Sequence, residues 1–67
     1  MRVREVIRIL RRNGFVERKA KGGHRQFIRS DPPPKRLVTV AHHTGDVPKT
    51  NLRRIATQAG KSPDEFH

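Results

Sequence analysis

The adjacent glycines Gly22-Gly23 constrain the fold of this chain more than any other feature. Neighbouring glycines accept the positive φ values that a tight hairpin needs, so they predict a turn between two antiparallel strands. We expect these strands at residues 15–19 and 24–29. Successive side chains of a strand alternate between its faces, so Phe27, as a core anchor, places His24 on the face away from the core.

Helices are predicted on both sides of this hairpin. The first spans residues 2–13 and is followed by Gly14, and the second begins after Thr50 as N-cap and ends at Gly60. Residues 36–41, rich in β-branched side chains, predict a third strand between them. Apolar residues recur on one side of each helix, at Val3, Val6, Ile7 and Leu10 and at Leu52, Ile55, Ala56 and Ala59.

The resulting order is α-β-β-β-α, which predicts an α+β fold in a single domain over residues 1–67. A three-stranded antiparallel sheet with both helices on one face leaves its other face open to solvent or to a partner. The helices are expected on the face shared by Phe27, Val38 and Val40. The open face is where His24 is expected.

The charge of the chain indicates a polyanionic partner. Sixteen Lys and Arg against six Asp and Glu give a net charge of +10, and twelve of the basic residues lie in residues 1–36. A phosphate backbone is the commonest partner of such a surface, and an anionic membrane surface is the alternative. No apolar run is long enough to span a membrane and no signal-peptide core follows Met1, so we expect a cytoplasmic protein without a membrane partner.

His24 is the candidate catalytic residue. An imidazole can accept and donate a proton near neutral pH, and RNA cleavage needs both acts, at the 2′-hydroxyl and at the 5′-oxygen. Basic side chains near it can hold the phosphate and stabilise charge on its oxygens. The residues expected to bind RNA in this way are Lys19, Lys21, Arg25 and Arg29.

The sequence does not favour a metal or a cofactor. The chain has no cysteine, and its six carboxylates are scattered. His42 and His43 are adjacent and would face opposite ways in an extended segment, so a shared metal site is disfavoured. His43 is a candidate for a second proton-transfer group. A histidine after a turn can also be a plain surface residue, which leaves a non-catalytic RNA-binding module and a protein that binds an acidic partner as alternatives.

Four segments together resemble the HicA-type mRNA interferase toxins over essentially the whole chain. They are Val6-Ile7-Arg8-Ile9-Leu10 with Asn13-Gly14-Phe15, Gly22-Gly23-His24-Arg25-Gln26-Phe27, Val38-Thr39-Val40 with His43, and Thr50-Asn51-Leu52-Arg53-Arg54-Ile55 with Gln58-Ala59-Gly60. Gly23 stands where the family usually has serine, and Ala41 where it often has proline.

The resemblance implies a fold like the double-stranded-RNA-binding domain, in agreement with the order of elements read from the residues. It also implies a toxin of a toxin–antitoxin system, an endoribonuclease that arrests translation by cleaving mRNA. His24 matches the family's functional histidine. The implied partner is a HicB-type antitoxin that covers this residue.

Overall fold

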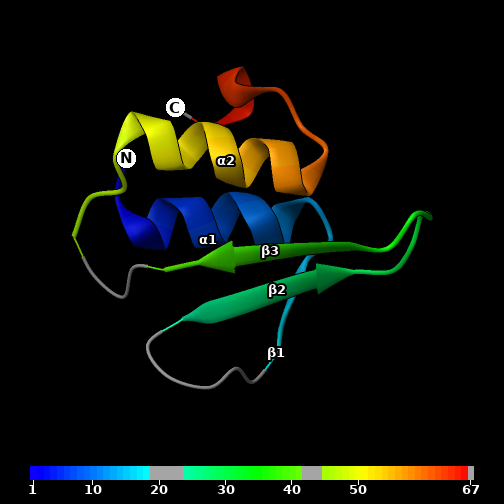
Figure 1. Cartoon of the computed structure of the whole chain (residues 1–67). Helices are drawn as coiled ribbons and strands as arrows, with labels where there is room; N and C mark the ends of the chain where they lie inside the picture. Colours follow the sequence, from blue (N-terminus) through cyan, green and yellow to red (C-terminus); the bar gives the residue numbers. More distant parts are fainter. Residues whose placement is uncertain (19–23, 42–44, 67) are drawn as a thin grey trace.

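The computed structural model describes residues 1–18, 24–41 and 45–66. Two helices, three strands and a short 3-10 helix follow one another in the predicted order (Figure 1). They are α1 (Val3–Arg12), β1 (Val16–Arg18), β2 (Arg25–Arg29), β3 (Arg36–Val40), α2 (Lys49–Ala59) and η1 (Pro63–Glu65). None of the described helices is long and apolar enough to cross a membrane.

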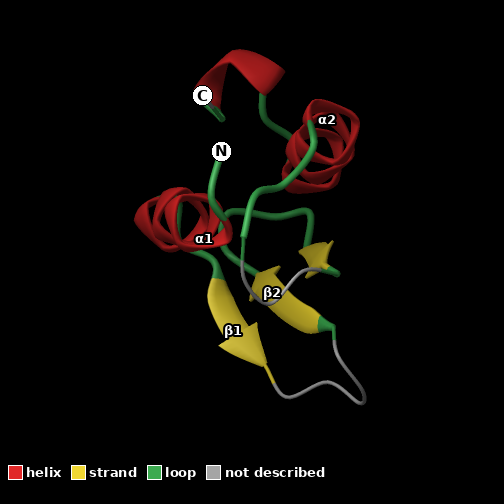
Figure 2. Cartoon of the chain, turned by 90° about the vertical axis from the view of Figure 1, so that its left-hand side faces the viewer, coloured by secondary structure: helices red, strands yellow, loops and turns green. Residues whose placement is uncertain are grey.

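The three strands form one antiparallel sheet in the order β1-β2-β3. Both helices lie on the same side of it, with α1 towards β1 and α2 towards β3 (Figure 2). The predicted α+β arrangement, with one sheet face free of helices, is therefore confirmed. The hairpin register pairs Glu17 with Phe27, and Phe27 is paired in turn with Val38.

The core lies between the sheet and the helices. Phe27, Val38 and Val40 are fully buried there, which confirms the predicted inner face of the sheet. The predicted apolar positions of both helices are buried as well. Phe15, Val47 and Phe66 complete the core, so all three phenylalanines pack inside.

Both helices end at glycines as predicted, but α2 begins earlier than expected. Gly14 and Gly60 have φ values of 88° and 70°, which L side chains rarely adopt. The prediction that Thr50 caps α2 was wrong, because Pro48 is the N-cap residue and Thr50 lies inside the helix. The Pro48 carbonyl accepts the first backbone hydrogen bonds of α2, at 3.0 Å from the nitrogens of Asn51 and Leu52.

Backbone contacts fix the start of α1 beside the segment that follows β3. Arg2 and Asp46 form an isolated β-bridge, and the Val3 N–H donates to the Gly45 carbonyl at 3.0 Å. The Val47 N–H donates to the Met1 carbonyl at 2.7 Å. The N-terminal end of α1 therefore lies at the end of the sheet where β3 finishes and β2 begins (Figure 1).

Candidate functional site

His24 lies directly before β2 and is exposed. Residues that alternate with it along the strand, Gln26 and Ile28, are half-buried on the face away from the helices, whereas Phe27 between them is fully buried. The imidazole makes no hydrogen bond or ion pair with another side chain of the described residues. An exposed imidazole in this position can reach a substrate without any movement of the core.

The open face of the sheet consists of two cross-strand rows with different chemistry. Val16, Ile28 and Leu37 are paired across the three strands and form an apolar row, in which Val16 is 66% and Leu37 43% exposed. The row nearer to His24 is polar. It consists of Arg18, Gln26 and Thr39.

Arg25 is held on the opposite face of the sheet by Glu17. Its Nε donates to Oε2 of Glu17 and its Nη2 to Oε1, both at 2.7 Å. The Arg11 guanidinium approaches the same carboxylate at 3.5 Å, while Arg25 also lies over the Phe27 ring, 5.8 Å from its centre. This two-point contact fixes the side chain of the residue that follows His24 and ties it to β1.

The electrostatics of this cluster favour the charged form of the carboxyl group. The hydrogen bond from Arg25, together with the positive charges of Arg25 and Arg11, lowers the pKa of Glu17 below its ordinary value of 4.5. Glu17 is therefore an anion at neutral pH, and it offsets the charge of Arg25.

Arg29 lies at the other end of β2 from His24, and its side chain has a packing role. Its guanidinium lies over the Phe15 ring at 5.0 Å from the ring centre, and its side-chain carbons pass beside Gly14. The Arg29 Nε is buried without a hydrogen-bond partner among the described residues. Arg29 is five residues after His24, a rise of roughly 17 Å along the strand, so the structure does not bring the two together.

The remaining predicted site residues, Lys19, Lys21 and His43, lie outside the described residues. Within residues 1–18, 24–41 and 45–66, no group of three His, Cys, Asp or Glu side chains lies close enough to hold a metal ion.

Sequence reasoning missed Glu17 as the partner of Arg25. The two residues are diagonal neighbours on one face of the β1–β2 hairpin, because Glu17 is opposite Phe27 and Arg25 is two residues from Phe27. The hairpin register would have revealed the pair, but the sequence pattern does not determine that register.

A comparison with curated proteins finds no match. The model of a protein family described as the HicA toxin of bacterial toxin–antitoxin systems matches residues 3–61, which include every described strand and both α-helices. Since the match covers most of the 67 residues, this chain belongs to the HicA toxin family.

Proposed function

We propose that this toxin is a metal-independent endoribonuclease of the mRNA interferase kind, with His24 as its acid–base residue. The observation that carries the proposal is the exposed imidazole of His24 directly before β2 in a HicA-family fold. Strand alternation from the buried Phe27 assigns it to the helix-free face. Proton transfer by a well-placed side chain typically accelerates a reaction by about 10²–10⁴-fold.

The reaction uses the RNA itself as nucleophile. The 2′-oxygen loses its proton and attacks the neighbouring phosphorus, the bond from phosphorus to the 5′-oxygen breaks, and the leaving 5′-oxygen gains a proton. The products are a 2′,3′-cyclic phosphate and a 5′-hydroxyl. His24 serves one of the two proton transfers, and we assign the other to His43.

The basic residues predicted around His24 have different roles in this proposal. Lys19 and Lys21 hold the scissile phosphate. The guanidinium of Arg25 is engaged by Glu17, so Arg25 acts as a positioning residue that holds the start of β2. Arg29 packs against Phe15 and stabilises the far end of the strand.

The partner of this toxin is proposed to be a HicB-type antitoxin that docks on the open sheet face. Val16 and Leu37 are the only exposed large hydrophobic residues among the described ones. Because they belong to one cross-strand row with Ile28, they offer a protein partner a continuous apolar contact on the same face as His24.

The test is cleavage of a labelled single-stranded RNA by the purified protein in EDTA. We expect cleavage products that end in a cyclic phosphate, and no cleavage of an all-2′-deoxy strand of the same sequence. Cleavage of the deoxy strand would contradict the 2′-hydroxyl mechanism, and loss of all activity in EDTA would show that a metal is required. RNA binding without cleavage, both in EDTA and in its absence, would identify a non-catalytic RNA-binding module instead.

A further inference from the structure

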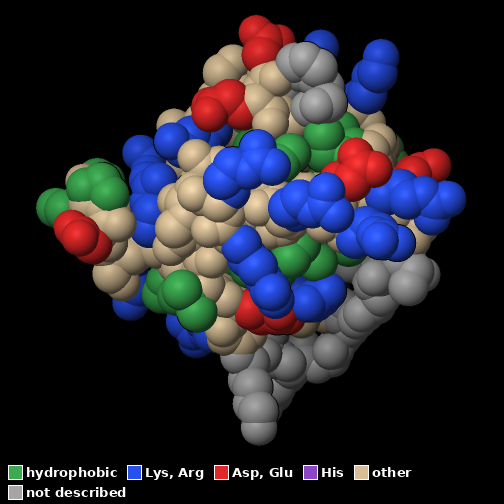
Figure 3. Space-filling view, turned by 180° about the vertical axis from the view of Figure 1, so that it is seen from behind, with side chains coloured by type: hydrophobic (Ala, Val, Ile, Leu, Met, Phe, Trp, Pro, Cys, Tyr) green, Lys and Arg blue, Asp and Glu red, His purple; other side chains and the backbone are tan. Residues whose placement is uncertain are grey.

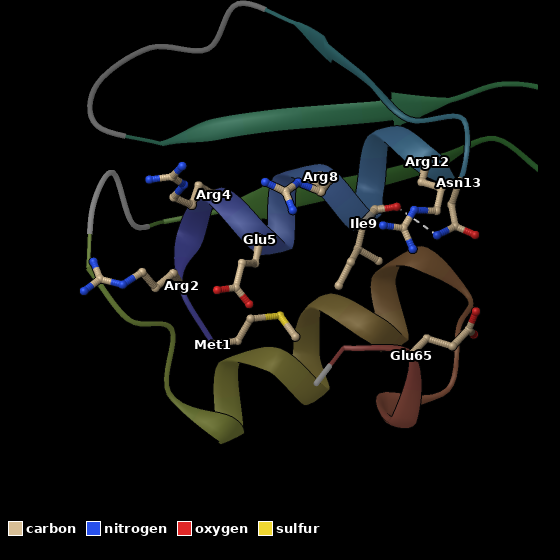
Figure 4. A pocket seen from close by; sticks show the side chains of 9 residues that line it. All are labelled: Met1, Arg2, Arg4, Glu5, Arg8, Ile9, Arg12, Asn13 and Glu65. Atoms are coloured by element: carbon tan, nitrogen blue, oxygen red, sulfur yellow. Dashed lines mark hydrogen bonds between the residues drawn. The ribbon is translucent and has the colours of Figure 1, made fainter.

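The outer surface of α1 carries a stripe of arginines that the fold does not use. Arg4, Arg8 and Arg12 recur at every fourth residue and are exposed. Four residues of an α-helix rise about 6 Å, so the three side chains follow one another along roughly 12 Å of one helix surface. In the close view they form a row along α1 (Figure 4).

These three arginines have no carboxylate partner within the described part of the chain. The ion pairs found there all belong to Glu17, which engages Arg25 and Arg11. Like charges four residues apart destabilise a helix by about 0.2–0.5 kcal/mol per pair. The stripe therefore opposes folding slightly, and a bound polyanion would relieve its repulsion.

The stripe borders an open hollow of about 690 Å³ on the outside of α1. Arg2 adds a fourth guanidinium, and the two carboxylates at the hollow are Glu5 and Glu65. Met1 and Ile9 contribute its apolar surface (Figure 4). From the side of α1, Lys and Arg side chains spread across the surface (Figure 3), whereas the open sheet face carries the apolar row.

The stripe begins at the end of the molecule where His24 lies. Arg2, directly before α1, forms a β-bridge with Asp46, which follows β3 in the sequence. Val40, the last residue of β3, is paired with Arg25, the neighbour of His24. Arg4 is thus the nearest member of the stripe to the His24 end of the sheet, and Arg12 is the farthest (Figure 4).

We propose that Arg4, Arg8 and Arg12 bind successive phosphates of the RNA strand on one side of the bond that His24 cleaves. This inference rests on the proposed ribonuclease function. RNA fits the stripe better than an acidic protein does, because the guanidinium fork matches phosphate oxygens and the charges repeat at a regular spacing. The apolar row, on another face, suits a protein partner.

The test compares two charge-matched double variants. Arg8→Gln with Arg12→Gln removes two charges from the stripe, and Lys35→Gln with Arg54→Gln removes two exposed charges that border no part of this hollow. Gln has a helix propensity close to that of Arg at the helical positions, and Lys35 lies in an exposed loop, so both variants should fold. Thermal melting checks this. The ligand is a fluorescent all-2′-O-methyl RNA, which cannot be cleaved, and its affinity is measured by anisotropy over a range of salt concentrations.

The stripe variant is expected to show a salt dependence that is shallower by about 1.4 in log–log slope, since each phosphate contact with a single strand contributes about 0.7. If the two proteins bind equally at 1 M salt, this difference in slope corresponds to roughly 25-fold weaker binding of the stripe variant at 0.1 M salt. The control variant should keep the slope of the wild type. Both outcomes together support the proposal.

Three results would overturn it in distinguishable ways. If the stripe variant binds the RNA as tightly as the control while the wild type still cleaves RNA, the stripe is not an RNA contact and the ribonuclease function stands. If that variant loses affinity only for poly-L-glutamate, the stripe is a contact for acidic protein. If the wild type neither binds nor cleaves RNA, the proposed function itself fails and the inference fails with it.

Discussion

Glu17 on β1 and Arg25 on β2 are joined by two hydrogen bonds of 2.7 Å each, and this pair lies one residue away from His24. The pair ties the two strands of the hairpin together on the helix side of the sheet, while His24 belongs to the other side. In our proposal, Glu17 and Arg25 position the imidazole without touching the substrate.

Replacing Glu17 with Gln should lower the free energy of unfolding by about 0.5–1 kcal/mol, because a partly exposed ion pair contributes little even with good geometry. Urea denaturation measures this change. The rate of RNA cleavage should fall further than the small loss of folded protein explains, with RNA affinity unchanged. Asp31→Asn, in an exposed loop, is the matched control. An unchanged cleavage rate in Glu17→Gln would remove the positioning role.

The stability of the protein should fall in acid partly through Glu17. Its pKa is below the ordinary 4.5 in the folded state, chiefly because of the hydrogen bond from Arg25. The unfolded chain therefore binds this proton first as the pH falls, and the contribution of Glu17 is present above the ordinary pKa and lost below it. From about pH 5 to about pH 3, the melting temperature of the wild type should fall more steeply than that of Glu17→Gln. Parallel curves would contradict this assignment.

Replacing His24 with Ala should slow cleavage severely and leave the fold intact. The side chain is exposed, so stability should change by at most about 0.5 kcal/mol. Loss of a positioned acid–base group should lower the cleavage rate by about 10²–10⁴-fold, and growth arrest should disappear with it. RNA binding should remain, because the basic side chains are unchanged.

Gln26→Ala, on the same face of β2, is the control for His24→Ala. It should retain cleavage. Melting, RNA binding and cleavage are measured in parallel for both variants. A folded His24→Ala protein that still cuts RNA would disprove the central role of His24 and would direct attention to His43.

Replacing Leu37 with Asp should prevent antitoxin binding without affecting the toxin. Leu37 is 43% exposed, so its replacement costs little core packing, but it places a charge in the apolar row with Val16 and Ile28. The proposed HicB-type antitoxin should stabilise the wild type by about 2.7 kcal/mol at a hundredfold excess over Kd, and should not stabilise the variant. Thr39→Asp, in the neighbouring polar row, is the control. Equal stabilisation of wild type and Leu37→Asp would place the antitoxin on another surface.

The sequence by itself determined the order of the elements, the inner face of the sheet and the exposure of His24. The period of the apolar residues distinguishes helix from strand, and the parity of a strand follows from Phe27 alone. The apolar period and the strand parity are local properties, so they can be predicted without knowledge of the tertiary structure. The start of α2 was predicted less well, because a Thr before an apolar stripe is a frequent N-cap. In the structure, Val47 is buried in the core and the helix begins directly after Pro48.

Only the tertiary structure decided which groups the basic side chains contact. Arg25, Arg29 and Arg8 are alike in sequence, but Arg25 meets Glu17 across the hairpin, Arg29 packs on Phe15, and Arg8 faces the outside of α1. The number of charges can be counted in the sequence. The partner of each charge depends on strand register and on which helix covers which strand. A long, flexible Arg side chain can reach several partners. Its interaction free energy differs little among them until packing brings one partner within hydrogen-bond distance.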